Sequence, residues 1–139
     1  MYSSSGAFQA LVNEAVNDDM QAQCSVGDIY ADETSDVYNV EKAVYWYKRA
    51  AEQGHSKAQW LLGASYSQGV GIEKNPEEAE NWLQKSAGSG DADGQYALAG
   101  FYFMKPDIVK AKYWLEKAAE QEHEEAKVML PKVLLLYDM

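Results

Sequence analysis

Residues 58–90 read AQWLLGASYSQGVGIEKNPEEAENWLQKSAGSG, and this stretch predicts two short helices joined by a glycine turn. Apolar residues recur every three or four positions in each half: Ala58, Leu62 and Tyr66, then Ala79, Trp82, Leu83 and Ala87. This spacing places the apolar side chains of each half on one face of a helix. Neither face can be buried alone, so the two helices must pack together and against further elements.

The middle of the stretch carries the signals that end one helix and begin the next. Gly69 and Gly71 can take the positive φ that a helix end requires. Asn75 offers an N-cap oxygen, Pro76 suits the first helical position, and Glu78 predicts a capping box. The second helix therefore has a defined start.

The same unit recurs on both sides. A shift of 36 residues aligns Ala22, Gly27, Tyr30, Asn39, Ala43 and Trp46 with Ala58, Gly63, Tyr66, Asn75, Ala79 and Trp82. A second shift aligns Gly94, Ala99 and Tyr102 and, after a deletion of four residues, Asp107, Ala111, Trp114 and Ala119. Agreement at a fixed period predicts a repeat protein with three units.

These residues resemble the Sel1-like repeat, a relative of the tetratricopeptide repeat. The resemblance covers about residues 20–130 and is carried by LLGASY (61–66), GVG (69–71), KAVYWYKRAAEQG (42–54), EAENWLQKSAGSG (78–90) and KAKYWLEKAAEQ (110–121). It implies an all-α fold: a right-handed α-solenoid of antiparallel helix pairs with a capping helix at each end. It also implies a role in protein binding.

The repeat register divides the chain. We expect one domain over residues 1–139: a cap helix at 5–17 that Ser4 or Ser5 begins, repeats at 18–54, 55–90 and 91–122, and a C-terminal cap at 123–139. The cap helix should bury Phe8, Leu11, Val12, Ala15 and Val16 on one face. Pro131 predicts a kink or break in the last helix. The final VLLLYDM either closes the last layer or offers an apolar surface.

Small and large residues should interlock between the helices. A close crossing needs alanine or glycine, and these occupy the repeated positions Ala22, Ala58, Gly94, Ala126, Gly27, Gly63 and Ala99. Trp46, Trp82 and Trp114 should fill the larger gaps between layers.

Charge and composition limit the partners. The net charge is −10, and residues 1–40 hold seven acidic residues and no lysine or arginine. Such a field disfavours nucleic acid and favours a basic protein or peptide, although a merely solvating face explains it equally well. No apolar run spans a membrane and no basic leader begins the chain, so we expect no membrane contact and a cytoplasmic protein, unless a leader was removed. The single cysteine fits a reducing compartment.

The resemblance also implies a binding face, because the first helices of tetratricopeptide-like folds line the concave side. By register, that face would present Trp60, Tyr96, Cys24, Asp28, Asp32, Lys57, Gln68 and Met104. Trp60 and Tyr96 occupy equivalent positions and would either anchor a partner or serve packing alone. Asp28 and Asp32 would attract a segment that bears lysine or arginine. The oligomeric state stays open.

Side chains for catalysis do not gather in the sequence. His55, Asp91 and His123 occupy equivalent helix starts, but a full helix layer of about 8–10 Å separates successive repeats, which excludes a shared metal within one chain. Cys24 has no histidine near it, and the glycine turns lack the lysine of a phosphate loop. We therefore expect no catalytic residue, no metal and no cofactor.

Three functions remain as hypotheses. The first is a non-enzymatic adaptor or scaffold that binds one protein through its concave face and acidic N-terminal edge. The second is an immunity protein that neutralises a bacterial toxin or effector, because Sel1-like proteins are encoded beside such toxins. The third, an enzyme-like protein that binds β-lactams, would follow the cysteine-rich members of the family, whose paired cysteines this chain lacks.

Overall fold

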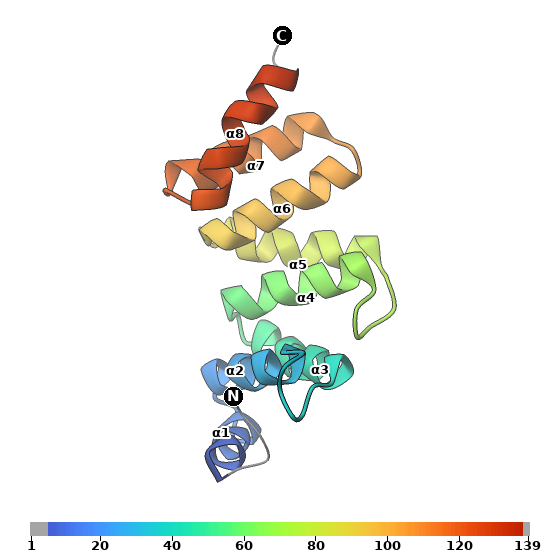
Figure 1. Cartoon of the computed structure of the whole chain (residues 1–139), viewed down its shortest axis with the longest axis vertical. Coiled ribbons are helices and arrows are strands. Elements are labelled where there is room, and N and C mark those ends of the chain that lie inside the picture. The colour runs from blue at the N-terminus through green and yellow to red at the C-terminus, as the bar shows by residue number, and fades with distance from the viewer. Residues whose placement is uncertain (1–5, 138–139) are drawn as a thin grey trace.

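The computed structural model describes residues 6–137, and these residues form a stack of α-helices (Figure 1). The helices of this part of the chain are α1 (Gly6–Val16), α2 (Met20–Ala31), α3 (Val40–Glu52), α4 (Ser56–Gln68), α5 (Pro76–Gly88), α6 (Ala92–Met104), α7 (Ile108–Glu120) and α8 (Glu124–Tyr137). The predicted all-α fold is confirmed.

Consecutive helices form antiparallel pairs, and the pairs follow one another along the long axis of the molecule (Figure 1). We call α2, α4, α6 and α8 the first helices, and α3, α5 and α7 the second helices. The first helices lie along one side of the stack and the second helices along the other. The first and last helices, α1 and α8, lie at opposite ends of the stack, as a solenoid requires.

The second helices begin at the predicted N-caps. The side chains of Asn39, Asn75 and Asp107 accept hydrogen bonds from backbone N–H groups three residues further on, at 3.0, 3.2 and 3.1 Å. The backbone N–H of each cap donates to the carbonyl of an equivalent tyrosine, and for Asn75 this acceptor is Tyr66, at 2.9 Å. The prediction that Glu78 completes a capping box is therefore wrong, because the N–H that it would accept is already bonded.

Both glycines of the turn have the positive φ angles that the sequence predicted. Gly69 ends α4 with φ +70°, and Gly71 has φ +75°. A Cβ atom on Gly71 would lie against the carbonyl oxygen of Val40 in the preceding repeat. The turn thus needs glycine both for its backbone angles and for the close approach of two repeats.

Small residues occupy the helix crossings, as predicted. A Cβ atom on Gly27 would lie 2.6 Å from the Tyr47 ring, and one on Gly63 would lie 2.7 Å from Cγ of Leu83. The third repeat has Ala99 at this position, and it is buried against Leu115. The helices α2, α4 and α6 therefore each meet the second helix of their own repeat at a distance that favours glycine or alanine.

The three tryptophans occupy equivalent places on the second helices. Trp46 is buried in the cluster formed by α1, α2 and α3. Trp82 packs half-buried against the central cluster, and Trp114 packs against both the central and the C-terminal clusters. The tryptophans thus connect successive layers, which agrees with the predicted role.

The first helix, α1, covers the N-terminal end of the stack. Phe8 and Ala15 are buried, and Leu11 and Val12 are half-buried against the same cluster. Val16 was expected on this face, but it is 55% exposed because it is the last residue of the helix, where α1 turns toward α2. The proposed cap at Ser4 or Ser5 lies outside the described residues.

The last helix, α8, runs unbroken from Glu124 to Tyr137 with Pro131 inside it, so the prediction of a break is wrong. Leu130 and Val133 pack against the C-terminal cluster on either side of the proline, which anchors the helix to the stack both before and after it. Pro131 and Lys127 are exposed, so water can bond the carbonyl of Lys127 that the proline leaves without an N–H donor.

The C-terminal apolar segment does both things that the sequence allowed. Val133 is 4% exposed and helps to close the last layer. Leu135 and Leu136 are 75% and 66% exposed on the other side of α8. Within residues 6–137, no helix is both long and apolar enough to span a membrane.

Candidate functional site

The first helices begin in a repeated polar arrangement at one edge of the stack. Asp19, His55 and Asp91 are N-caps of α2, α4 and α6, and His123 bonds the start of α8 in the same way. The register predicted the equivalence of His55, Asp91 and His123. Within the described part of the chain, no three histidine, cysteine, aspartate or glutamate side chains lie close enough together to hold a metal ion.

Both histidines are fixed by hydrogen bonds from two sides. Nδ1 of His55 accepts from the backbone of Ala58 at 3.2 Å, so its other ring nitrogen donates to Gln21 at 3.0 Å. Burial, followed by the nearby charge of Lys57, lowers the pKa of His55 below its usual value. This histidine is therefore a neutral capping residue that joins α4 to α2.

His123 is bonded in the same way and also positions Tyr96. Its Nδ1 accepts from Ala126 at 3.2 Å, and its Nε2 lies 2.8 Å from a carboxylate oxygen of Asp93. The imidazole stacks on the ring of Tyr96, with centroids 4.7 Å apart and planes 23° from parallel. Tyr96 of α6 is therefore packed against the residue that precedes α8, with part of its surface left open.

Asp28 and Lys57 are brought together from neighbouring first helices. Nζ of Lys57 donates to one carboxylate oxygen of Asp28 at 3.0 Å, and the hydroxyl of Tyr47 donates to the other at 2.7 Å. The first of these bonds raises the pKa of Lys57. Asp28 thus already has a positive partner within the protein, which reduces its predicted attraction for a basic partner.

Asp32 lies in the exposed loop between α2 and α3. Its carboxylate accepts from the backbone and the hydroxyl of Thr34, at 2.9 and 2.7 Å, and the hydroxyl bond chiefly lowers the pKa of Asp32. Glu33 and Asp36 are exposed beside it. We call residues 32–36 the acidic loop.

Cys24 does not line an accessible surface. The residue is 1% exposed, and burial raises the pKa of its thiol to about 11, with the charge of Asp28 as the second cause. Cys24 shares a register position with Trp60 and Tyr96, but its short side chain stays beneath the surface. The prediction that Cys24 contacts a partner is corrected accordingly.

Trp60 packs against the core of the stack. The side chain is half-buried against the central cluster. Its indole N–H is buried, and no acceptor reaches it within residues 6–137. The two aromatic residues that share this register are both half-buried: Trp60 packs against the central cluster and Tyr96 against the C-terminal cluster.

Two predicted residues, Gln68 and Met104, line one hollow between α4 and α6. This hollow has a volume of about 170 Å³, and Ala64, Leu83 and Phe101 form much of its remaining wall. Met104 is 73% exposed at its rim. Gln68 and Met104, which were predicted to share one face, therefore do line the same hollow.

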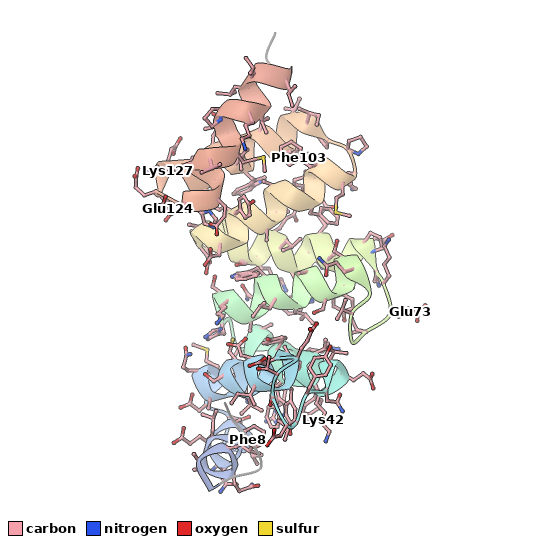
Figure 2. The ribbon with its side chains drawn as sticks, in the orientation of Figure 1. Phe8, Lys42, Glu73, Phe103, Glu124 and Lys127 are labelled. Atoms are coloured by element: carbon pink, nitrogen blue, oxygen red, sulfur yellow. The ribbon has the colours of Figure 1, made fainter. Side chains whose placement is uncertain are left out.

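Two further hollows adjoin Tyr96. One, of about 200 Å³, lies between α6, α7 and α8 and includes Phe103, Leu115 and Met129. The other, of about 330 Å³, lies along α8 and includes Val128 and Met129 beside Glu124 and Glu125. Figure 2 shows Phe103 and Glu124 in this C-terminal part of the stack, far from Phe8.

Sequence reasoning missed Phe103, Val128 and Met129. The register could have found Val128, because a shift of 32 residues, which is the period less the four-residue deletion, carries Tyr96 onto it. We call the surface of the three hollows around Gln68, Tyr96, Met104 and Val128 the apolar face. It occupies the C-terminal half of the first-helix side, while the acidic loop lies at the N-terminal half.

Comparison with known proteins agrees with the fold of repeated helix pairs. A model of the Sel1 repeat matches residues 21–55, 56–91 and 92–123. A search of curated proteins found no match.

Solved structures with the same fold come from several bacteria. A Sel1 repeat protein from Oxalobacter formigenes is 31% identical, with a TM-score of 0.81 over 89% of this chain and 51% of its own length. The protective antigen c5321 of uropathogenic Escherichia coli, which displays an SLR fold, is 33% identical, with a TM-score of 0.84 over 93% of this chain and 28% of its own. Helicobacter pylori cysteine rich protein B is 22% identical, with a TM-score of 0.66 over 89% of this chain and 92% of its own, and shares the fold.

The chain thus spans about half of the first of these proteins and less than a third of the second. The three matched repeats occupy most of its length and coincide with the three helix pairs of the structure. The chain belongs to the Sel1 repeat family.

Proposed function

We propose that this chain is a non-enzymatic interaction module, an adaptor or scaffold, that holds a segment of a partner protein along its first-helix side. Sel1 repeat proteins generally mediate protein–protein interaction. The observation that carries the proposal is the apolar face, where three hollows of about 170, 200 and 330 Å³ lie near one another around α6. We also propose that the chain divides into three repeats, at residues 18–54, 55–90 and 91–122, between two end helices.

The apolar face suits the side chains of a bound segment. Tyr96 is an amphipathic ring already immobilised by His123, so contact with it costs little further conformational entropy. Met104 and Val128 are 73% and 60% exposed and can adapt to a partner's shape. A rigid aromatic residue surrounded by flexible apolar ones is the arrangement that interface hot spots favour.

The acidic loop suits a basic end of the same segment. Asp32, Glu33 and Asp36 are exposed, and no lysine or arginine occurs among residues 1–40. With a net charge of −10, the chain steers a positively charged protein toward itself. The proposed partner is therefore a protein segment with apolar side chains at one end and lysine or arginine at the other, and the proposed compartment is the cytoplasm.

Several polar side chains along the first helices are already engaged in structural contacts. This supports a role in binding rather than in catalysis. His55 and His123 cap helices, Asp28 pairs with Lys57, and Cys24 is buried with a raised pKa. A group that reacts with substrate needs a free, correctly ionised atom within an enclosed pocket. These residues are instead engaged in holding successive repeats together.

The experiment that tests the proposal is selection of peptides from a displayed library against the wild-type chain, followed by affinity measurement with variants. The selected peptides should combine apolar residues with a basic end. Tyr96→Ala should weaken their binding by about tenfold or more. The matched control is Tyr113→Ala, since Tyr113 is 52% exposed on α7, on the second-helix side.

Equal losses in Tyr96→Ala and Tyr113→Ala, with both variants folded, would refute the proposed face. Affinity for the native partner separates the two roles that the sequence left open. A salt-sensitive complex of moderate affinity indicates an adaptor, whereas a stoichiometric complex of nanomolar or tighter affinity indicates an inhibitor such as an immunity protein.

A further inference from the structure

Gly100 is a glycine inside α6 that the packing of the chain does not require. Glycine in a helix interior is destabilising relative to alanine. Gly27 and Gly63 lie at close helix crossings, where an added Cβ atom would lie 2.6 and 2.7 Å from Tyr47 and Leu83. An added Cβ atom on Gly100 would meet no atom of the described residues within 4 Å, and the backbone there is helical. Neither a close crossing nor a positive φ therefore explains this glycine.

Gly100 lines a hollow of about 200 Å³ between two neighbouring repeats, with α6 and α7 on one side and α8 on the other. We call it the Gly100 hollow. Apart from the hydroxyl of Tyr96, its lining side chains are apolar, and they include Ala97, Phe103, Leu115 and Met129. The absence of a side chain on Gly100 thus leaves free space beside an apolar wall.

The equivalent position is filled differently in each repeat. Asp28, Ala64 and Gly100 follow one another at the period of 36 residues. The carboxylate of Asp28 accepts hydrogen bonds from Tyr47 at 2.7 Å and from Lys57 at 3.0 Å, so the chain's own side chains use this place. Ala64 borders the hollow of about 170 Å³, and Gly100 borders the one of about 200 Å³. The third repeat is therefore the one in which this position is most open to a partner.

A phenyl ring suits the Gly100 hollow. An apolar protein cavity of about 150 Å³ can stay dry and take up benzene. The Gly100 hollow, at about 200 Å³, has room for a ring of that size. Phe103 and Tyr96 can contact the ring as aromatic neighbours, and the sulfur of Met129 also favours aromatic contact. A charged or amide side chain would lose its hydration there and find few hydrogen-bond partners.

Two carboxylates lie next to this place. The hollow of about 330 Å³ shares Tyr96 and Met129 with the Gly100 hollow, and Glu124 and Glu125 border it. Within the described part of the chain, no lysine or arginine lines either hollow. A positive charge close to the bound ring is therefore complemented by the protein.

The charged neighbours on α8 set the direction of that complementarity. Glu125 lies 3.4 Å from Nδ1 of His123, but this nitrogen accepts from the backbone of Ala126 and so offers Glu125 no hydrogen. Lys132 follows Met129 by about one helical turn and lines neither hollow. A basic residue of the partner is thus attracted toward the start of α8 and repelled from the Lys132 side.

We propose that the Gly100 hollow is a specificity pocket for one phenylalanine side chain of the partner segment, and that a lysine or arginine beside it lies against Glu124 and Glu125. This assignment rests on the proposed function, which places the segment along the first helices, and it adds the side chain that fixes the segment's position. Gly100 then has a functional reason, because a helix without a Cβ atom at this point admits the ring and a close approach of the partner's backbone.

The test uses a small probe, acetyl-phenylalanyl-lysine amide, added to the whole isotope-labelled chain. Nuclear magnetic resonance should show saturable shifts of the backbone resonances of Gly100, Phe103 and Met129 at millimolar concentration. Acetyl-alanyl-lysine amide should bind about tenfold or more weakly, because it lacks the ring. Acetyl-phenylalanyl-glutamate amide should bind about threefold or more weakly at low salt, because Glu124 and Glu125 repel its carboxylate.

Matched protein variants locate the binding. Gly100→Leu fills the hollow from α6 and should weaken the probe about tenfold or more, while resistance to urea stays the same or rises because a glycine leaves the helix. Ala64→Leu is the control at the equivalent position of the other hollow, and its affinity should stay within about twofold of wild type. Should Gly100→Leu not fold, Glu124→Gln with Glu125→Gln serves instead and should bring the lysine and glutamate dipeptides within about twofold of each other.

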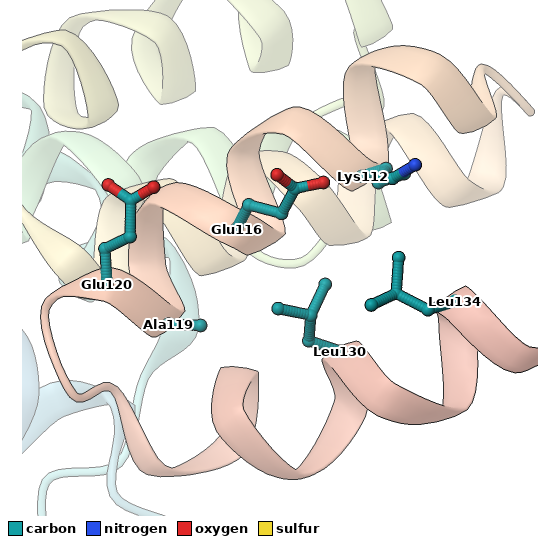
Figure 3. A pocket seen from close by; sticks show the side chains of 6 residues that line it. All are labelled: Lys112, Glu116, Ala119, Glu120, Leu130 and Leu134. Carbon is teal, nitrogen blue, oxygen red and sulfur yellow. The ribbon is translucent and has the colours of Figure 1, made fainter. Parts of the chain in front are cut away.

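The groove between α7 and α8 is the alternative site for a small probe. Figure 3 shows Leu130 and Leu134 pointing from α8 toward α7. Lys112 lines this groove together with Glu116 and Glu120, so its border carries charges of both signs. Shifts confined to residues around Leu130 and Leu134 would place the probe there and overturn the proposal.

Three other results would also overturn it: equal binding of the phenylalanine and alanine dipeptides, equal losses in Gly100→Leu and Ala64→Leu, or no saturable shift at probe concentrations up to about 20 mM. The proposed function can fail separately. Library-selected peptides that bind through Tyr96 but tolerate alanine at every phenylalanine would leave the interaction module in place and remove the phenylalanine pocket. Saturable dipeptide binding at Gly100, without any longer peptide selected, would support the pocket and count against the module.

Discussion

Replacement of Gly63 by alanine should destabilise the protein, although alanine favours helices. Gly63 lies inside α4 at the crossing with α5. A Cβ atom there would lie 2.7 Å from Cγ of Leu83, 3.0 Å from its Cδ2 and 3.2 Å from the carbonyl oxygen of Ala79. Neither the branch point of Leu83 nor the backbone of Ala79 can move aside without shifting α5.

The expected magnitude follows from two opposing effects. Overpacking of a well-packed crossing costs about 1–3 kcal/mol, and the contact with backbone places Gly63 toward the upper value. The gain in helix propensity from glycine to alanine is about 1 kcal/mol. We therefore expect Gly63→Ala to lower the free energy of unfolding by about 1–2 kcal/mol.

The matched control is Gly100→Ala. Gly100 lies inside α6, and its added Cβ would meet no atom within 4 Å. This variant should raise the free energy of unfolding by about 0.5–1 kcal/mol, because only the propensity changes. Equilibrium unfolding in urea, followed by far-ultraviolet circular dichroism, measures both changes under the same conditions.

A second variant tests the contact itself. Leu83→Ala alone should cost about 2–5 kcal/mol through the lost leucine, but the added methyl of Gly63→Ala should then fit the space. The double variant should therefore be more stable than the sum of the single changes predicts, by about 1 kcal/mol or more. If Gly63→Ala is as stabilising as Gly100→Ala, the close crossing that we describe does not exist in solution.

Two further predictions concern the acidic loop and the cysteine. Neutralising the loop with Asp32→Asn, Glu33→Gln and Asp36→Asn should slow association with a selected basic peptide and flatten its salt dependence in stopped-flow measurements, whereas unchanged rates at low salt would remove the loop from the binding account. Cys24 should react with iodoacetamide at pH 8 at least about 100-fold more slowly in the folded chain than in the unfolded chain, because its pKa is raised from 9.0 to about 11 and less thiolate is present. The rate should rise with pH toward 11, and labelling at the unfolded rate would show that the thiol is accessible.

The fold could be predicted because capping residues and small residues recur at equivalent positions in successive repeats. Asn39, Asn75 and Asp107 cap equivalent helices, and Gly27 and Gly63 permit equivalent crossings. Such features are local or periodic, so they can be recognised in the sequence without knowledge of distant contacts.

The candidate site could be predicted only in part, because register fixes the direction of a side chain and not its neighbours. Register placed Asp28 and Lys57 on one side, but not that they pair with each other at 3.0 Å. It treated Cys24 and Tyr96 as equivalent, although side-chain length leaves one buried and the other accessible. The behaviour of Pro131 also depends on its surroundings, since packing on both sides of it keeps α8 continuous.

Chemical-shift mapping of a bound peptide is the most direct test of the account's central claim, which is that partners bind along the first helices. The library-selected peptide, added to isotope-labelled protein, should shift backbone resonances around Tyr96, Met104 and Val128 and in the acidic loop. Resonances of the outward residues Tyr45 and Tyr113, which are 57% and 52% exposed on α3 and α7, should stay unchanged. Shifts gathered around Tyr45 and Tyr113, with none around Tyr96, would contradict the account.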